Sequence, residues 1–331
     1  MQEDEIGVLM SEAAKAVQSR LIRDLEPVVA VEFDRHLNTT KDWYPHEYVP
    51  WSEGRNFPGP LNGDAWEAKD SKLTSIAQDS LILNLLTEDN LPSYHTEIAL
   101  SMARDGAWNS WINRWTAEEA RHSIVLRDYL MATRGVNPDE LEDLRMAHMQ
   151  VGYETPYETD MLHTVSYVTF QELATRISHR NTGKISNDPI CEGMLARVAL
   201  DENLHMLFYR NLLGAALELE PNAAMRAITD VVTNFQMPGA GMPGWGRKSV
   251  QIALAGIYDL QLHLEDVVNP VLRAWNIFGL ETLSGDGQAA RDELALWLEQ
   301  AAADVSQFTE KRDSHFERLV ARGQEPIRLQ P

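Results

Sequence analysis

Apolar residues recur every three or four positions along most of the chain, which is the spacing of a helix that buries one face. Residues 3 to about 37 show this spacing. One interruption is expected at Pro27, because proline has no amide hydrogen for a helix interior, followed by a second helix or a kinked continuation. Residues 38–69 lose the pattern and are rich in proline, glycine and aromatic residues. This composition predicts a long loop whose aromatic side chains pack against a helical body.

The rest of the chain divides into further helical segments at proline and glycine residues. Between residue 71 and about 104, Pro92 is expected to kink the helix or to begin a new one. Asn181-Thr182-Gly183 is expected to end a helix. Residues 237–244 should separate a C-terminal part with two or three helices up to about residue 322. The other helices are predicted at 106–134, 138 to about 151, 157 to about 180, 189 to about 218, and from 221 onward.

Strand-like alternation is scarce, and leucine, alanine and glutamate are plentiful, so the pattern predicts an all-α protein. No stretch has the composition of a linker between domains. We therefore expect one domain over residues 1–331, with its central helices between about residues 71 and 218. A chain of this length can bury a substantial core.

The chain carries 29 Lys and Arg residues against 50 Asp and Glu residues, a formal net charge of −21. Nucleic acids and anionic membrane surfaces are bound through basic faces, so this charge argues against both. No apolar stretch approaches the length of a membrane span. The single cysteine, Cys191, fits a reducing compartment, and the acidic N-terminus lacks the features of a signal peptide. A cytoplasmic location is therefore expected.

Two copies of a Glu-x-x-His motif stand out, each preceded by a single glutamate. The six residues are Glu88, Glu119, His122, Glu172, Glu202 and His205. The lone glutamate precedes its motif by 31 residues in the first copy and by 30 in the second, about one helical hairpin. Residues three apart share one side of a helix, so each motif could hold one metal ion. This order matches the ligand set of ferritin-like proteins with two metal ions.

The residue types also suit a particular metal chemistry. Glutamate and imidazole together favour iron or manganese. Taken singly, each residue is more simply a solvated acid or a core histidine; the matching order and gaps of all six favour a metal site. Glu172 supports this view, because it lies among apolar residues such as Val168 and Leu173, where a lone carboxylate would be costly.

Longer blocks around these motifs resemble the soluble acyl-acyl-carrier-protein desaturases of plastids and actinobacteria, most closely the actinobacterial branch. The matching blocks are Thr87–Tyr94, Trp115–His122, Phe170–His179 and Asp201–His205. The resemblance extends from about residue 25 to about residue 307. Ala120 and Ser123 depart from the family's more usual Asn and Gly, but neither is a metal ligand.

The resemblance implies a ferritin-like helical bundle with a four-helix di-iron core, additional flanking helices, and a homodimer. It implies two iron ions per chain, held by the six residues above, with dioxygen as co-substrate and a ferredoxin-type electron donor. The substrate would be a fatty acyl chain on an acyl carrier protein, which receives a cis double bond. Thr175 would lie beside the iron centre as a proton donor. Trp115 and Asp201 would support the metal ligands, joined by Trp43.

Two further sets of residues follow from this interpretation. An acidic carrier protein would need local cations, and the candidates are Arg20, Arg23, Arg35, His36 and Lys41, with Arg247-Lys248 as another group. The candidates for lining a substrate channel are Leu91, Trp111, Ile112 and Phe170. Three alternatives remain: a related di-iron oxygenase or hydroxylase, a ferritin-like iron store, and a helical scaffold that has lost its metal.

Overall fold

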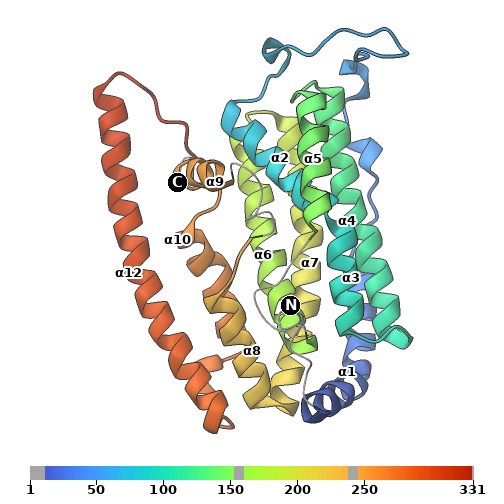
Figure 1. The fold of residues 1–331 in the computed structure, drawn as a ribbon, viewed down its shortest axis with the longest axis vertical. Coiled ribbons are helices and arrows are strands. Elements are labelled where there is room, and N and C mark those ends of the chain that lie inside the picture. The colour runs from blue at the N-terminus through green and yellow to red at the C-terminus, as the bar shows by residue number, and fades with distance from the viewer. Residues whose placement is uncertain (1–11, 153–159, 238–244, 330–331) are drawn as a thin grey trace, which may run out of the picture.

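The computed structural model describes residues 12–152, 160–237 and 245–329, and every regular element in these ranges is helical (Figure 1). The first eight α-helices are α1 (Glu12–Thr39), α2 (Ser75–Asp89), α3 (Leu91–Ser101), α4 (Gly106–Ala132), α5 (Pro138–Val151), α6 (Met161–Ile185), α7 (Pro189–Leu219) and α8 (Pro221–Thr233). The prediction of an all-α protein is confirmed over the described chain. None of its helices has the length and apolar character to cross a bilayer.

The C-terminal part contains α9 (Trp245–Leu254), α10 (Leu260–Leu262), a π-helix (His263–Val268), α11 (Asn269–Ala274) and α12 (Gly285–Ala321). Because α10, the π-helix and α11 follow one another directly, this part has three longer helical stretches, which agrees with the predicted two or three, and a short 3₁₀-helix (Ile277–Gly279) before α12. The predicted break at 237–244 lies almost wholly outside the described residues.

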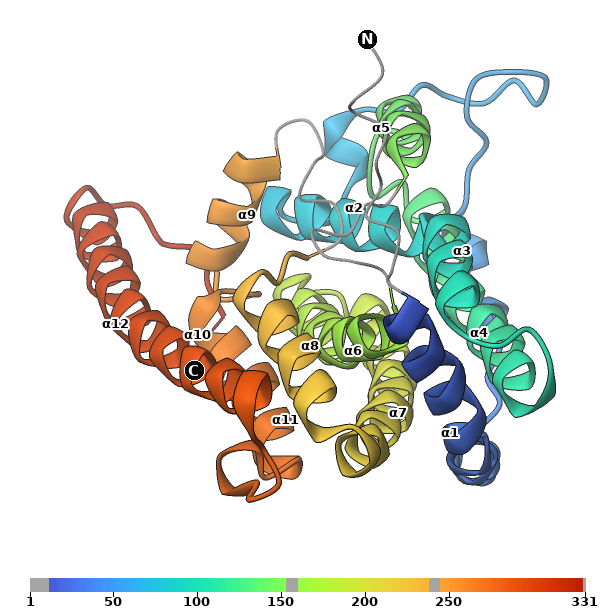
Figure 2. The ribbon, with the colours of Figure 1, turned by 60° about the horizontal axis from the view of Figure 1, so that its bottom comes forward.

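The long helices pack side by side (Figures 1 and 2). Helices α6 and α7 pack extensively against each other, α1 lies against both α4 and α7, and α8 lies between α6 and α12. In both views α12 forms one edge of the molecule, and α3 and α4 lie toward the opposite edge. Helices α2, α4, α6 and α7 contact one another as a group, α2 with α4 and α6, and α7 with α4 and α6.

The buried apolar residues form two clusters with a polar zone between them. Along α4, the residues from Trp108 to Trp115 belong to the first cluster and those from Val125 to Ala132 to the second. Helix α7 is divided in the same way, between its part up to Val198 and its part from Met206 onward. Each helix thus carries its Glu-x-x-His motif at the level where one apolar cluster ends and the other begins.

One predicted helix end is wrong, and one open alternative is decided. Helix α1 is continuous from Glu12 to Thr39, with Pro27 inside it, so of the two predicted alternatives the chain adopts the continuation. The predicted end near residue 180 is wrong, because helix α6 runs through Gly183 to Ile185. Gly183 is there for packing: a Cβ at this position would lie 3.1 Å from the Cα of Glu192 on α7. The predicted start of α6 at residue 157 falls outside the described residues.

The predicted loop over residues 38–69 is present, and it contains three short 3₁₀-helices: Pro45–Glu47, Trp51–Glu53 and Ala68–Asp70. Buried Arg134, at the end of α4, holds it in place. The Arg134 guanidinium donates to Asp70 at 2.9 Å and to the Ala65 carbonyl at 2.8 Å, and it lies over the Phe57 ring. Trp43 is buried as expected, whereas Trp51 is exposed. The end of the loop near Asp70 is therefore fixed by Arg134 next to the helices that carry the predicted ligands.

Candidate metal centre

All six predicted ligands meet in the polar zone between the two apolar clusters, and none is more than 6% exposed. Glu88 comes from the last turn of α2, Glu119 and His122 from α4, Glu172 from α6, and Glu202 and His205 from α7. The three-residue spacing puts each Glu and its His on the same side of its helix.

The six residues form two overlapping groups. Glu88, Glu119, His122 and Glu202 make the first group, and Glu119, Glu172 and His205 make the second. Within each group the ligand atoms all lie within 4.8 Å of one another. His122 Nδ1 is 3.2 Å from Glu202 Oε1 and 3.6 Å from Glu88 Oε2. His205 Nδ1 is 2.6 Å from Glu119 Oε1. Glu119 belongs to both groups and would be the one residue that two bound ions share.

Unsatisfied polar atoms show that these residues fit metal ions. Buried atoms normally have hydrogen-bond partners, and each exception needs an explanation. Six side-chain atoms of the predicted ligands have none within the described chain: Glu119 Oε1, His122 Nδ1, His122 Nε2, Glu172 Oε2, Glu202 Oε1 and His205 Nδ1. All six belong to residues of the two groups above. A carboxylate and imidazole donor set of this composition suits iron or manganese.

The second carboxylate oxygen of Glu172 and that of Glu202 each accept a hydrogen bond from a neighbouring side chain. Trp115 Nε1 donates to Glu172 Oε1 at 2.9 Å, and Thr175 Oγ1 donates to Glu202 Oε2. Trp43 Nε1 donates to Asp201 Oδ2 at 2.7 Å. Asp201 Oδ2 in turn lies 3.6 Å from Nε2 of His122. Trp115 and Thr175 thus each contact a predicted ligand directly, and Trp43 reaches His122 through Asp201.

Three residues next to the ligands were not predicted for this site. His179 Nε2 lies 2.8 Å from Glu88 Oε1, and Glu118 Oε2 accepts from His205 Nε2 at 2.9 Å. His36 Nε2 also reaches Glu118 Oε2. His179 lies seven residues after Glu172, two turns along the same side of α6, and this spacing could have signalled it. For His36 no such signal exists, because its contact to Glu118 spans 82 residues.

The buried charges perturb one another strongly. Burial, together with the negative charges of Glu119 and Glu202, raises the pKa of Glu172 well above its ordinary value. Burial lowers the pKa of His205, but the neighbouring Glu172 and Glu118 outweigh this effect, so that the pKa is raised overall. Such a concentration of displaced pKa values is typical of a functional site.

The predicted carrier-docking cations need one correction. His36 is buried and bonded to Glu118, so it cannot present a charge at the surface. Others already have acidic partners: Arg20 pairs with Glu220, Arg35 with Glu32, and Lys248 with Asp79.

The four residues predicted to line a substrate channel differ in their surroundings. Trp111 and Phe170 are buried core residues, and Trp111 stacks on Phe208 with 3.5 Å between ring centroids. Ile112 lines a surface hollow between α3 and α4, of about 340 Å³. Leu91 is only partly buried, at the start of α3.

Fold and site together define a ferritin-like helical bundle with a buried carboxylate and histidine centre suited to two metal ions. The fatty acid desaturase family matches residues 17–321. A Mycobacterium tuberculosis protein named "Putative acyl-acyl-carrier-protein desaturase DesA1" is 46% identical over 318 residues, 94% of each chain. The chain therefore belongs to the fatty acid desaturase family, in the acyl-acyl-carrier-protein desaturase branch found in actinobacteria.

More distant relatives agree. The X-ray structure of DesA2 from Mycobacterium tuberculosis is 30% identical and superposes with a TM-score of 0.67 over 79% of this chain and 97% of that one. A chloroplastic stearoyl-acyl-carrier-protein 9-desaturase from Arabidopsis thaliana is 30% identical over 228 residues, 64% of this chain and 58% of the relative. As a member of this family, the chain is an oxidoreductase of lipid metabolism.

Proposed function

We propose that the protein introduces a cis double bond into a fatty acyl chain carried on an acyl carrier protein, using dioxygen and two electrons at a di-iron centre. The observation that carries this proposal is the pair of buried groups that share Glu119 and direct unsatisfied ligand atoms at one another. The names of the relatives, which are acyl-carrier-protein desaturases, support the substrate class.

The first iron ion would be held by Glu88, Glu119, His122 and Glu202, and the second by Glu119, Glu172 and His205. Bound iron would supply the redox chemistry that activates dioxygen for removal of two hydrogens from adjacent methylene carbons. The chain's own part is to fix the ligand geometry and to exclude water. The apolar clusters on either side of the centre serve the second purpose.

Thr175 is placed to hold a proton beside the centre. Its Oγ1 lies 2.5 Å from Glu202 Oε2 and 3.1 Å from the carbonyls of Gln171 and Glu172. A hydroxyl carries one hydrogen, so it can donate to only one of these acceptors at a time. A hydroxyl that can exchange its acceptor beside a metal ligand suits delivery of that proton to reduced oxygen.

A cavity of about 310 Å³ between α2, α6 and α9 is the candidate entrance for the acyl chain. Its lining includes Leu83, Ile252 and Tyr258, together with Asn84 and Ser178. Asn84 lies 3.3 Å from the ring of His179, which contacts Glu88. Asn84 and His179 therefore separate the cavity from the first ligand group.

We infer three further properties from the family relationship. A ferredoxin-type protein would donate the electrons, two copies of the chain would form a homodimer, and the enzyme would work in the cytoplasm. The net charge of −21 makes the approach of an acidic carrier dependent on local cations, so its binding should weaken as salt is added.

The test is aerobic incubation of the iron-loaded protein with reductant and acyl carrier protein bearing acyl chains of several lengths, followed by mass spectrometry of the lipids. The proposal predicts a product two mass units lighter than the substrate, since two hydrogens are lost. An inserted oxygen would instead identify a di-iron hydroxylase. Unchanged lipid with every chain length, from protein that holds about two iron ions, would contradict both.

A further inference from the structure

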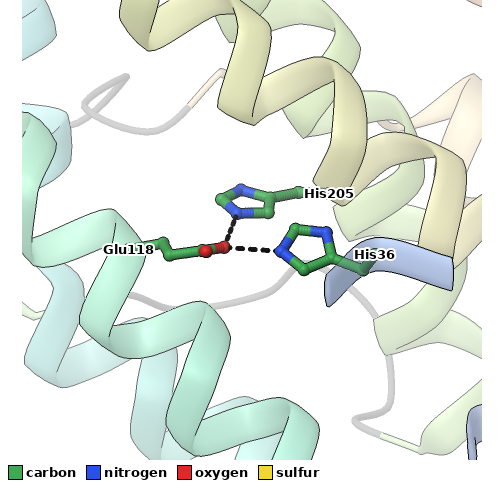
Figure 3. A group of neighbouring side chains, drawn as sticks. All are labelled: His36, Glu118 and His205. Carbon is green, nitrogen blue, oxygen red and sulfur yellow. Dashed lines mark hydrogen bonds and ion pairs between the residues drawn. The ribbon is translucent and has the colours of Figure 1, made fainter. Parts of the chain in front are cut away.

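Three side chains from three helices meet beside the metal centre: His36 of α1, Glu118 of α4 and His205 of α7 (Figure 3). The Nε2 atoms of both rings point at the same atom, Glu118 Oε2, at 2.8 Å from His36 and 2.9 Å from His205. All three side chains are buried. Because an ionised carboxylate only accepts hydrogen bonds, both Nε2 atoms must carry a hydrogen and donate it.

This arrangement decides which face of His205 is free for a metal. In a neutral imidazole with its hydrogen on Nε2, the lone pair is on Nδ1. Nδ1 is the atom that faces the ligand carboxylates, 2.6 Å from Glu119 Oε1 and 3.4 Å from Glu172 Oε2. Glu118 therefore selects the tautomer that can bind a metal ion at the second ligand group.

Glu118 is itself fixed from the other side. Arg114, one turn earlier on α4, reaches Glu118 Oε1 with Nε at 2.6 Å and with a terminal nitrogen at 2.5 Å. One oxygen thus belongs to the guanidinium and the other to the two rings. The side chains of His36, Glu118 and His205 also lie close enough together to form a metal-binding group of their own. However, both ring nitrogens point hydrogens at the carboxylate and a guanidinium lies against it, so a third ion would meet positive charge.

The ring of His36 is also held in a definite orientation. It stacks on His205 with centroids 5.7 Å apart and meets Trp111 edge-on at 5.1 Å. Helix α1 supplies none of the six ligands, yet it packs along α4 and α7, which carry both Glu-x-x-His motifs. His36 is the point at which α1 contacts the support of the metal centre.

We propose that His36 is a positioning residue for the metal centre, which acts through Glu118 to fix the ring and the tautomer of His205. The second hydrogen bond to Glu118 Oε2 keeps this oxygen aimed between the two rings. Without it the carboxylate could rotate toward Arg114 alone, and His205 would lose its partner. The inference depends on the proposed metal centre.

The test compares two substitutions at one position in apoprotein titrated with Co²⁺. His36→Phe keeps a ring against Trp111 and His205 but removes the donor, whereas His36→Gln keeps an amide donor. We expect His36→Phe to weaken one of the two Co²⁺ sites about tenfold and to leave the other nearly unchanged. His36→Gln should restore most of the affinity. The same loss of affinity from both variants would overturn the proposal, since it would show a steric rather than a hydrogen-bonding role.

A spectroscopic signature reports on His205 directly. In the Co²⁺ protein, the Nε2 hydrogen of a ligand histidine gives a strongly shifted proton NMR signal. We expect one such signal to exchange with water faster in His36→Phe than in the wild-type protein or in His36→Gln. His263→Phe is the matched control, because His263 is also buried but bonds to Tyr258 outside the metal centre.

The outcomes separate the two proposals. If the wild-type protein binds no Co²⁺, the proposed metal centre fails and this inference fails with it. If the wild-type protein binds two ions and His36→Phe changes neither site nor the exchange rate, only the role of His36 is overturned. Should His36→Phe not fold, His36→Asn replaces it, because the shorter amide cannot reach Glu118 and the same loss is expected.

Discussion

The two halves of the metal centre are its two ligand groups, and each contains the lone glutamate and the histidine of one sequence repeat. The helices that carry the lone glutamates differ. In the first half, α2 ends at Asp89, directly after Glu88, and a new helix starts at Leu91. In the second half, α6 continues without a break from Glu172 to Ile185 and packs closely along α7. The repeat in sequence therefore specifies equivalent ligands without specifying equivalent surroundings.

The support of the two histidines shows the consequence. His205 Nε2 donates to Glu118 at 2.9 Å, a full hydrogen bond. His122 Nε2 lies 3.6 Å from Asp201 Oδ2, which is already engaged by Trp43 and Arg121. The histidine of the second half is thus held more firmly than the histidine of the first. We expect the second site to bind its metal ion more tightly.

The largest expected effect comes from the one ligand that both halves share. Glu119→Ala should reduce bound iron from about two ions per chain to nearly none and abolish desaturation, because each group loses a carboxylate. Iron analysis of protein loaded without oxygen measures this. Glu310→Ala, at an exposed position of α12, is the control and should keep both ions. A Glu119→Ala protein with one ion firmly bound would show that Glu119 serves only one half.

Removing one private ligand from each half tests the comparison directly. Glu88→Ala and Glu172→Ala should each leave about one ion per chain, since each carboxylate belongs to a single group. The ion that remains in Glu88→Ala should be the more tightly held of the two. Competition with a chelator ranks the two variants. The opposite order would refute the idea that the second half is the firmer one.

Loss of the Thr175 hydroxyl should affect turnover and spare the metals. Thr175→Val keeps the shape of the side chain but removes the hydrogen beside Glu202, and we expect kcat to fall about tenfold or more. Iron content should stay at the wild-type value. Thr175→Ser, which retains the hydroxyl, should recover most of the activity. A parallel loss of iron in Thr175→Val would mean that the threonine supports Glu202 instead.

Smaller effects are expected from the single donors to the two private carboxylates. Trp115→Phe removes the hydrogen bond to Glu172, and His179→Phe removes the one to Glu88. Each change should weaken metal binding at its own half about tenfold, as is usual for such partners. Titration of the two apoproteins with Co²⁺ compares them. If both changes weaken the same site, the division into halves is wrong.

The smallest expected effect concerns the anchoring of α6, the helix that carries Glu172 of the second half. His163 Nδ1 and Nε2 lie 3.0 and 3.2 Å from Asp160 and Asp230. Burial lowers its pKa, but these two carboxylates outweigh burial and raise the pKa to about 9. A raised pKa stabilises the fold fully below the unfolded value of 6.5, and the effect is lost as pH rises through about 9.

We therefore expect His163→Gln to be less stable than the wild-type protein by about 1–3 kcal/mol near pH 6. The difference should shrink toward pH 10. Chemical unfolding at several pH values measures it, and a difference that does not change with pH would exclude a charged His163. Desaturation by the folded variant should be little affected.

The sequence was sufficient where chemistry depends on local spacing. Glu119 and His122 share one helix, and their three-residue spacing predicted that they would face the same way, as the structure has them. The nearly equal gaps from Glu88 and Glu172 to the two motifs, 31 and 30 residues, predicted that the four helices come together. The all-α fold follows from the same periodicity. The roles of these residues as metal ligands remain a prediction that the variants above would test.

Other features depend on contacts between distant parts of the chain. His36 looked like a surface cation in the sequence, but helix α1 turns it inward to Glu118, 82 residues away. Gly183 looked like a helix end, because glycine usually marks one; in the structure it allows α7 to approach α6. In both cases packing between helices overrode the local preference of the residue.

The concentration of four carboxylates in one buried space has a consequence for how the protein is loaded. Burial and the neighbouring carboxylates raise the pKa of Glu172 above its ordinary value, so this site binds a proton more readily than an isolated glutamate does. Iron uptake would then release protons into solution. Acidification of the surroundings would favour the proton-filled, inactive protein, so the supply of active enzyme would depend on pH as well as on the availability of iron.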